Sequence, residues 1–143
     1  MIPGRVLVTG ARGFIGKRVT AALLRRGAEV HGITSAPAAR NGSGVHWHQV
    51  DLLDPTVSLQ RLMEEIRPCG LVHLAWYVAH GKYWEAPENH LWAARSLELL
   101  KAFCQVGGAR ALCAGTCAEY DYGVEGPYRE GATPVNPRTV YGQ

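Results

Sequence analysis

Three closely spaced glycines lie between a short apolar run and a helical pattern near the start of the chain. Gly10, Gly13 and Gly16 belong to the string VTGARGFIG, which begins at residue 8. Residues 5–10 are β-branched and apolar and predict a buried strand. Residues 14–27 have apolar side chains at helical spacing, a basic last turn and a terminal glycine, which predicts a helix. The first 27 residues therefore predict a strand, a glycine turn and a helix in direct succession.

The same alternation of element types continues along the chain. Further strands are predicted at 28–34, 44–51, 70–76 and 110–116, and further helices at 56–67 and 88–107. Strands that alternate with crossover helices pair in parallel, so the predicted fold class is α/β with a doubly wound parallel sheet. Residues 117–137 are predicted to form a long loop at the carboxyl end of a strand, where such folds place their chemistry.

Composition excludes several classes of protein. The chain has 143 residues, of which 47% are hydrophobic and 19% charged, as expected for a globular domain. Its formal charge of +3 gives no argument for nucleic acid. No apolar run reaches the roughly 20 residues of a membrane span, and no secretion signal is evident, so we predict a cytoplasmic protein with no membrane partner. The four cysteines form no Cys-x-x-Cys pair and are predicted to be buried, reduced thiols.

Each glycine of the first turn can be given a physical role. Gly10 permits a tight turn, Gly13 lets the backbone approach a phosphate group, and Gly16 lets the helix pack closely on the sheet. The free N–H groups and the dipole of the following helix attract an anion. The alternative is three packing glycines without a ligand, but their position at the first strand-to-helix turn favours a dinucleotide.

Motifs in the same order along the chain resemble the extended short-chain dehydrogenase/reductase family, the NAD(P)-dependent nucleotide-sugar epimerases, dehydratases and 4-ketoreductases. The resemblance covers the whole chain and rests on TGARGFIG (9–16), VDLLD (50–54), VHLAW (72–76), Asn89, AGTCAEYDYG (114–123) and YREGATPVNPRTVYGQ (128–143). It implies a Rossmann-like fold, a nucleotide-sugar substrate, and a homodimer formed through the helix at 88–106.

The candidate cofactor-binding residues come from the glycine turn, the ends of the strands and the long helix: Gly10, Arg12, Gly13, Phe14, Ile15, Gly16, Thr34, Ser35, Arg40, Asp51, Leu52, Leu74, Ala75, Trp76 and Asn89. The resemblance implies that Asp51 and Leu52 contact the adenine. The predicted second strand ends without the carboxylate that binds the ribose of NAD, while Arg12 and Arg40 suit an extra phosphate. We therefore expect NADP to be preferred over NAD, although both arginines could instead be surface charges.

Tyr141 and Thr116 are the candidate catalytic residues. In the resembled family a Tyr is the acid/base, and a Lys four residues later lowers its pKa; the matching position, 145, lies two residues beyond the end of this sequence. Thr116 would orient the substrate oxygen, or it could merely cap the strand end. Cys117 and Ala118 stand where dehydratases carry adjacent Asp and Glu, which argues against 4,6-dehydration and leaves 4-keto reduction or C4 epimerisation.

The sequence predicts one dinucleotide-binding domain over 1–143, truncated within the active-site helix and lacking a C-terminal substrate domain. The alternative function is a catalytically inactive dinucleotide-binding module, used as a sensor or partner surface. His46 and His48 could form half of a metal site, but no third ligand is evident and no metal is predicted. The aromatic residues of 76–92 could stack on a sugar or base, or could pack in the core or in a dimer contact.

Overall fold

The computed structural model describes residues 4–37 and 44–143, and within them five parallel strands form one sheet in the order β3-β2-β1-β4-β5. The strands are β1 (Arg5–Thr9), β2 (Glu29–Thr34), β3 (Val45–Gln49), β4 (Gly70–His73) and β5 (Arg110–Cys113). The helices are α1 (Phe14–Arg25), α2 (Leu59–Ile66) and α3 (Glu88–Gln105), with 3-10 turns η1 (Tyr83–Glu85) and η2 (Cys117–Glu119). The predicted doubly wound α/β class is confirmed.

The strand order reverses beside β1. The chain runs from β1 through β2 to β3 on one side and then continues with β4 and β5 on the other. Thr9, the last residue of β1, pairs in register with His73, the last residue of β4. In a doubly wound sheet this switch point opens a crevice at the carboxyl ends of the strands, which is where ligands bind.

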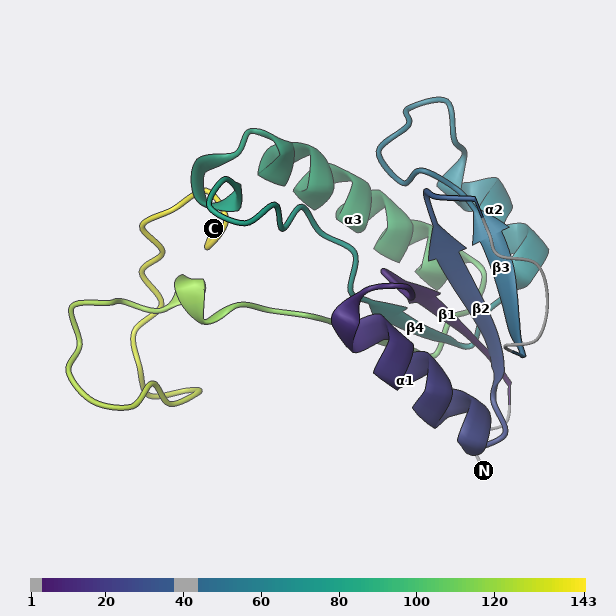
Figure 1. Ribbon diagram of the computed structural model, residues 1–143, viewed down its shortest axis with the longest axis horizontal. Helices are drawn as coiled ribbons and strands as arrows, with labels where there is room; N and C mark the ends of the chain where they lie inside the picture. The colour runs from purple at the N-terminus through teal and green to yellow at the C-terminus, as the bar shows by residue number, and fades with distance from the viewer. Residues whose placement is uncertain (1–3, 38–43) are drawn as a thin grey trace. The chain divides into compact units, whose positions relative to one another are not determined.

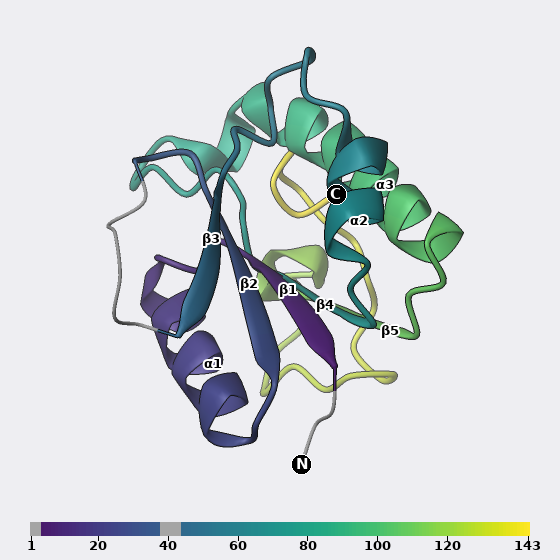
Figure 2. The same cartoon turned by 90° about the vertical axis from the view of Figure 1, so that its right-hand side faces the viewer.

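Helices cover both faces of the sheet (Figures 1 and 2), with α1 on one face and α2 on the other. Buried side chains of β1 pack on both faces of the sheet, because successive side chains of a strand point to opposite faces. Val6 and Val8 pack in the cluster that also receives Leu23 and Leu24 of α1. Leu7 is fully buried on the opposite face. Other large side chains that are almost fully buried are Leu59, Met63, Ile66, Leu71, Leu99 and Phe103.

The chain divides into two compact parts, which we describe separately. The sheet unit comprises the described residues up to Ala75 together with Ala94–Cys113. The loop unit comprises Trp76–Ala93 and Ala114–Gln143. The helix α3 contributes its first residues to the loop unit and the remainder to the sheet unit.

The prediction for the cysteines is wrong in one respect. Cys69, Cys104, Cys113 and Cys117 are reduced thiols, as predicted, but all four are exposed rather than buried. Cys113 ends β5, an edge strand whose four residues are all exposed, and Cys104 lies on the outward side of α3. For Cys113 and Cys104, the position at a sheet edge and on an outward helix face outweighs the tendency of cysteine to be buried.

Among the described residues, no helix combines the length and the hydropathy that a membrane span needs. The predicted division into a dinucleotide-binding domain and a substrate domain beyond residue 143 stays a prediction. The last residues form a single turn, in which the Gly142 N–H donates to the Thr139 carbonyl over 3.1 Å.

Candidate functional site

Gly10 lies where the glycine turn meets the end of β4. Its φ of 63° is in the left-handed region, and a Cβ placed on it would lie 2.9 Å from both the Ala75 nitrogen and the Leu74 carbonyl carbon. Both the backbone conformation and the close approach therefore require glycine at this position. The contact brings three of the predicted cofactor residues together at the switch point of the sheet.

Gly16 is required by the turn itself. A Cβ on Gly16 would overlap the Gly10 carbonyl oxygen and lie 2.8 Å from the Ala11 Cα. The atoms that Gly16 approaches belong to the turn, so the predicted packing of the helix on the sheet is not what requires glycine here. For a Cβ on Gly13, the neighbour within 4 Å among the described residues is the Gly10 oxygen, at 3.1 Å.

The first turn of α1 is open to an anion. Gly13 is its N-cap and supplies no side-chain cap, and the first turn contains no acidic residue. Phe14 and Ile15 are 88% and 57% exposed, so both side chains lie outside the core. Uncapped N–H groups at the positive end of a helix dipole bind phosphate.

A buried hydrogen-bond network holds the end of β4 against the end of β1. Thr9 Oγ1 accepts from the backbone N–H groups of Leu74 and Ala75, each over 3.1 Å. Its own hydrogen is therefore directed to His73 Nδ1, 2.7 Å away. The His73 Nε2–H then donates to Ser96 Oγ over 2.8 Å. We call Thr9, His73 and Ser96 the switch-point network.

The charge state of His73 follows from these partners. The acceptor role of Nδ1 requires a neutral imidazole, because a protonated ring would direct a third donor at the Thr9 hydroxyl oxygen, which already accepts from two N–H groups. Burial also lowers the pKa of His73 below its ordinary value. The network thus fixes the backbone of Leu74 and Ala75 beside Gly10 with a neutral histidine, and the sequence motifs did not reveal it.

The end of β2 carries hydroxyl groups and an arginine. The Thr34 hydroxyl donates to the Ala36 carbonyl over 3.2 Å, and Ser35 is exposed. Arg12 reaches this segment from the glycine turn, where its Nη1 donates to the Pro37 carbonyl over 2.8 Å. The structure thus brings Arg12 to the end of β2, and its predicted role in cofactor binding stays a prediction. Arg40 lies outside the described residues.

The loop after β3 is held by a side chain from α3. Asp51 Oδ1 accepts from the Leu53 N–H over 2.9 Å, and the Leu52 side chain is buried. Arg95 donates to the backbone carbonyls of Leu52, Asp54 and Val57 over 2.6, 3.3 and 3.1 Å. The predicted contact of Asp51 and Leu52 with adenine stays a prediction, and Arg95 is a residue that the sequence motifs missed.

In the loop unit, Asn89 and Trp76 bond to each other. The Trp76 indole N–H donates to Asn89 Oδ1 over 2.8 Å, and Asn89 Nδ2 donates to the carbonyls of Tyr83 and Ala86 over 2.7 and 3.0 Å. Asn89 is only 2% exposed. Its amide therefore orders η1 in this structure, and the predicted cofactor role of the pair stays a prediction.

Both candidate catalytic residues belong to the loop unit. Thr116 is half-buried and caps η2, where its Oγ1 accepts from the Ala118 N–H over 3.1 Å. The Tyr141 ring makes edge contacts with the rings of Tyr83 and Trp84, at centroid distances of 4.8 and 5.8 Å. The Tyr141 N–H donates to the Trp84 carbonyl over 3.0 Å. Tyr83 and Trp84, two of the aromatic residues predicted to bind a ligand, pack in the core or form a dimer contact, thus contact Tyr141.

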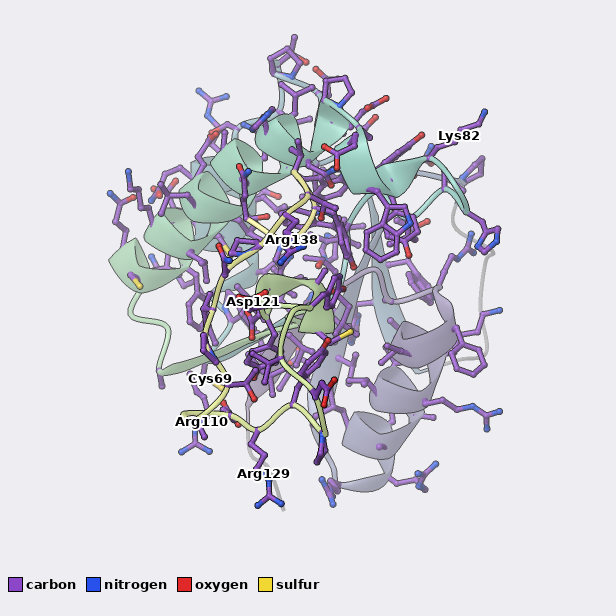
Figure 3. All side chains as sticks on the ribbon, turned by 90° about the vertical axis from the view of Figure 1, so that its left-hand side faces the viewer. Cys69, Lys82, Arg110, Asp121, Arg129 and Arg138 are labelled. Carbon is purple, nitrogen blue, oxygen red and sulfur yellow. The ribbon has the colours of Figure 1, made fainter. Side chains whose placement is uncertain are left out.

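Several contacts join the segments that carry Thr116 and Tyr141. Gly142 packs so closely on the Ala118 carbonyl that a Cβ would overlap it. Asp121 accepts from the Gly123 N–H over 2.8 Å and from Arg138 over 3.2 Å (Figure 3). These bonds hold the Asp121 carboxyl's pKa below its ordinary value, with the Gly123 N–H as the largest cause. The carboxylate therefore remains charged and keeps the two ends of the loop together.

A third histidine, His31, lies beside His46 and His48, the two residues considered as half of a metal site. His31 of β2 pairs in register with His46 of β3 and lies 2.9 Å from His48, between its Nδ1 and the His48 Nε2. His31 Nε2 also donates to Glu29 over 3.1 Å. Both nitrogens of His31 are thus engaged, and no group of three or more ligands able to hold a metal ion occurs in residues 4–37 and 44–143.

The chain matches one known protein family over almost its whole length. Residues 6–143 match the model of the NAD dependent epimerase/dehydratase family. The chain is 27% identical to UDP-glucose 4-epimerase of Streptomyces lividans, covering 97% of this chain and 44% of that protein. It is 28% identical to dTDP-6-deoxy-L-talose 4-dehydrogenase (NAD(+)) of Aggregatibacter actinomycetemcomitans, covering 96% and 50%.

A solved structure supports the same assignment. UDP-glucose 4-epimerase of Thermus thermophilus, in complex with NAD, superposes with a TM-score of 0.79 at 32% identity, covering 96% of this chain and 46% of that one. The chain spans about half the length of the relatives it matches. The family match, which extends from β1 to the last residue, confirms the resemblance inferred from the motifs. The chain belongs to the NAD-dependent epimerase/dehydratase family.

Proposed function

We propose that this chain binds NADP(H) and serves an oxidoreductase or epimerase that acts at C4 of a nucleotide-linked sugar. The observation that carries the proposal is the open first turn of α1, with Gly13 as its N-cap, no acidic residue, and Gly10 against the end of β4. A pyrophosphate fits this turn because its charge complements the helix dipole and the N–H groups lack a side-chain cap. The relatives named above act on UDP- and dTDP-linked sugars, which supports the substrate class.

The preference for NADP rests on the end of β2. Thr34 and Ser35 stand where a carboxylate would hold the ribose hydroxyls of NAD, and a carboxylate there would repel a 2′-phosphate. Arg12 is already directed to this segment through its bond to the Pro37 carbonyl. A guanidinium forms two parallel hydrogen bonds with a phosphate, so Arg12 is suited to the extra phosphate of NADP.

The catalytic roles rest on two side chains of the loop unit. When the cofactor is bound, its nicotinamide ring supplies or removes a hydride at the sugar carbon. The Tyr141 phenol would give a proton to, or take it from, the oxygen on that carbon. Thr116 Oγ1 already accepts from the Ala118 N–H, so its own hydrogen remains to be donated to the same oxygen. In a reductase the transfer is net, whereas an epimerase returns the hydride to the other face of the sugar.

The first experiment is a titration of the 143-residue chain with NADP⁺ and NAD⁺, followed by thermal unfolding. Saturation at 100 times the dissociation constant is expected to stabilise the fold by about 2.7 kcal/mol. A substitution of Gly13 by Asp places a carboxylate in the turn and is expected to abolish the shift, while Lys17→Asp, one turn further along α1, is the matched control. No shift with either dinucleotide in the unsubstituted chain refutes the proposal.

A second measurement separates the two reactions. Steady loss of NADPH absorbance with a 4-keto nucleotide sugar supports net reduction, whereas interconversion of sugar epimers with a catalytic amount of cofactor supports epimerisation. Replacement of Tyr141 by Phe removes the proton donor and is expected to abolish either reaction while leaving cofactor binding intact. Full activity of that variant would show that the acid/base lies elsewhere.

We also propose that the protein forms a homodimer through α3. Leu91 and Leu97 of this helix are 58% and 54% exposed, so α3 carries large apolar side chains that a second copy of the chain could cover. Replacement of Leu97 by Glu is expected to convert a dimer to a monomer in sedimentation experiments. A monomer before substitution would refute this part of the proposal.

A further inference from the structure

Trp47 lies on β3 directly beside Gly32 of β2, with which it pairs in register. A Cβ on Gly32 would come within 2.7 Å of the Trp47 ring, so the absence of a side chain at Gly32 creates the space for the indole. Trp47 also packs at the margin of the core cluster that includes Val30, on the face of the sheet covered by α1. Two neighbouring strands thus fix the position of this ring.

The guanidinium of Arg12 lies over the Trp47 ring. Its Cζ is 5.1 Å from the ring centroid, which is a cation–π distance, and its Nη1 donates to the Pro37 carbonyl over 2.8 Å. Arg12 is half-buried, so the interaction is partly shielded from water. A guanidinium has five N–H donors in one plane, and the bond to Pro37 needs only one of them.

We propose that Trp47 is a specificity-determining residue, which positions the Arg12 guanidinium to accept the 2′-phosphate of NADP. This inference rests on the proposed function and extends it to a residue that contacts the arginine rather than the cofactor. An arginine that moves freely loses side-chain entropy when it binds a phosphate, whereas one already held against a ring and a carbonyl loses less. Trp47 therefore favours NADP over NAD without touching the phosphate.

The competing explanation is that Trp47 only fills space beneath α1. Substitution of Trp47 would then lower the stability of the fold and weaken the binding of both dinucleotides equally. The ratio of the dissociation constants for NAD⁺ and NADP⁺ separates the two explanations, because the dinucleotides differ only in the phosphate that Arg12 would bind.

The experiment measures this ratio by calorimetric titration of the 143-residue chain and of Trp47→Leu, Trp47→Phe, Arg12→Ala and the Trp47→Leu/Arg12→Ala double variant. Loss of the cation–π contact in Trp47→Leu is expected to reduce the preference for NADP⁺ about three- to tenfold. Arg12→Ala is expected to reduce the preference for NADP⁺ further. The Trp47→Leu/Arg12→Ala double variant is expected to show the same preference as Arg12→Ala alone. Trp47→Phe retains a π face and is expected to keep most of the preference, which guards against a folding defect in Trp47→Leu.

Val45→Ala is the matched control, because Val45 lies on the same strand and packs against the same core cluster as Trp47. It is expected to lower stability and leave the ratio unchanged. The inference is overturned if Trp47→Leu leaves the ratio unchanged, if Val45→Ala changes it equally, or if Trp47→Leu still acts in the Arg12→Ala background. A chain that binds NAD⁺ with no preference for NADP⁺ overturns both this inference and the cofactor preference, but not dinucleotide binding. A chain that binds neither refutes the proposed function itself.

Discussion

Because Thr9 is at the centre of the switch-point network, we expect a conservative substitution of this residue to lower the free energy of unfolding strongly. Replacement of Thr9 by Val retains the shape of the side chain and removes its hydroxyl. The change leaves two backbone N–H groups, of Leu74 and Ala75, and the Nδ1 of His73 without their partner. Thr9 is 0% exposed, so water does not replace the lost bonds.

The expected magnitude follows from these three groups. Each buried polar group left unsatisfied costs about 1–3 kcal/mol, and partial relaxation reduces the sum, so we expect a loss of about 3–5 kcal/mol. A domain of this kind has about 5–15 kcal/mol of unfolding free energy in total. With a slope of about 1–3 kcal/mol per molar urea, the unfolding midpoint should fall by at least about 1 M.

Thr20 provides the matched control, since it is another buried threonine. Its hydroxyl makes a single bond, to the Lys17 carbonyl of its own helix over 3.1 Å. Thr20→Val is expected to cost less than about 1 kcal/mol, because that carbonyl belongs to the helix ladder. Thr9→Ser, which retains the hydroxyl, should recover most of the loss. Urea unfolding followed by far-ultraviolet circular dichroism measures all three, and equal losses in Thr9→Val and Thr20→Val would falsify the assignment of the network.

Three other sets of contacts lead to predictions of their own. Burial and the nearby His31 lower the pKa of His48, so the folded state binds fewer protons than the unfolded state. The free energy of unfolding should therefore fall as pH drops below about 6.5. His48→Gln should reduce this dependence, measured by urea unfolding on either side of that pH, while the contribution of His73 remains. Arg95→Met removes three bonds to carbonyls and should cost about 2–4 kcal/mol by urea unfolding, whereas Glu98→Gln, at its exposed ion pair, should cost below about 1 kcal/mol. Gly142→Ala forces a side chain against η2, which Thr116 caps. The change should therefore raise the Kd for a nucleotide sugar and leave the Kd for NADP⁺ unchanged. An equal rise in both Kd values would contradict the proposed role of Thr116 and Tyr141 in substrate binding.

Local patterns were sufficient to predict the elements of the fold. Each predicted strand and helix is present, and the differences are confined to their ends. The helix predicted from residue 56 begins at Leu59, because Ser58 caps it by accepting from the Arg61 N–H. Asp54 accepts from the Thr56 N–H and keeps that segment in a turn. Such short polar side chains suit both turns and helix ends, so the sequence pattern alone could not choose between them.

Contacts between distant elements were not predictable in the same way. His31 joins His46 and His48 only because β2 and β3 pair in one particular register. Arg95 reaches the loop after β3 from a helix about forty residues later in the chain. Neither register nor crossing geometry is encoded in a window of a few residues, so His31 and Arg95 looked like isolated polar positions in the sequence.

Internal packing explains some of the glycines in the turn between β1 and α1, but not all of them. The protein's own atoms occupy the space where a Cβ would stand on Gly10 or Gly16, so internal packing alone accounts for both. Gly13 has an ordinary φ of −67°. Among the described residues, the atom near its missing Cβ is the Gly10 oxygen at 3.1 Å, which a small shift could accommodate. The fold therefore requires glycine strictly at two of the three positions. For the third position, Gly13, we propose that the glycine keeps a side chain away from a pyrophosphate bound at the N-terminus of α1.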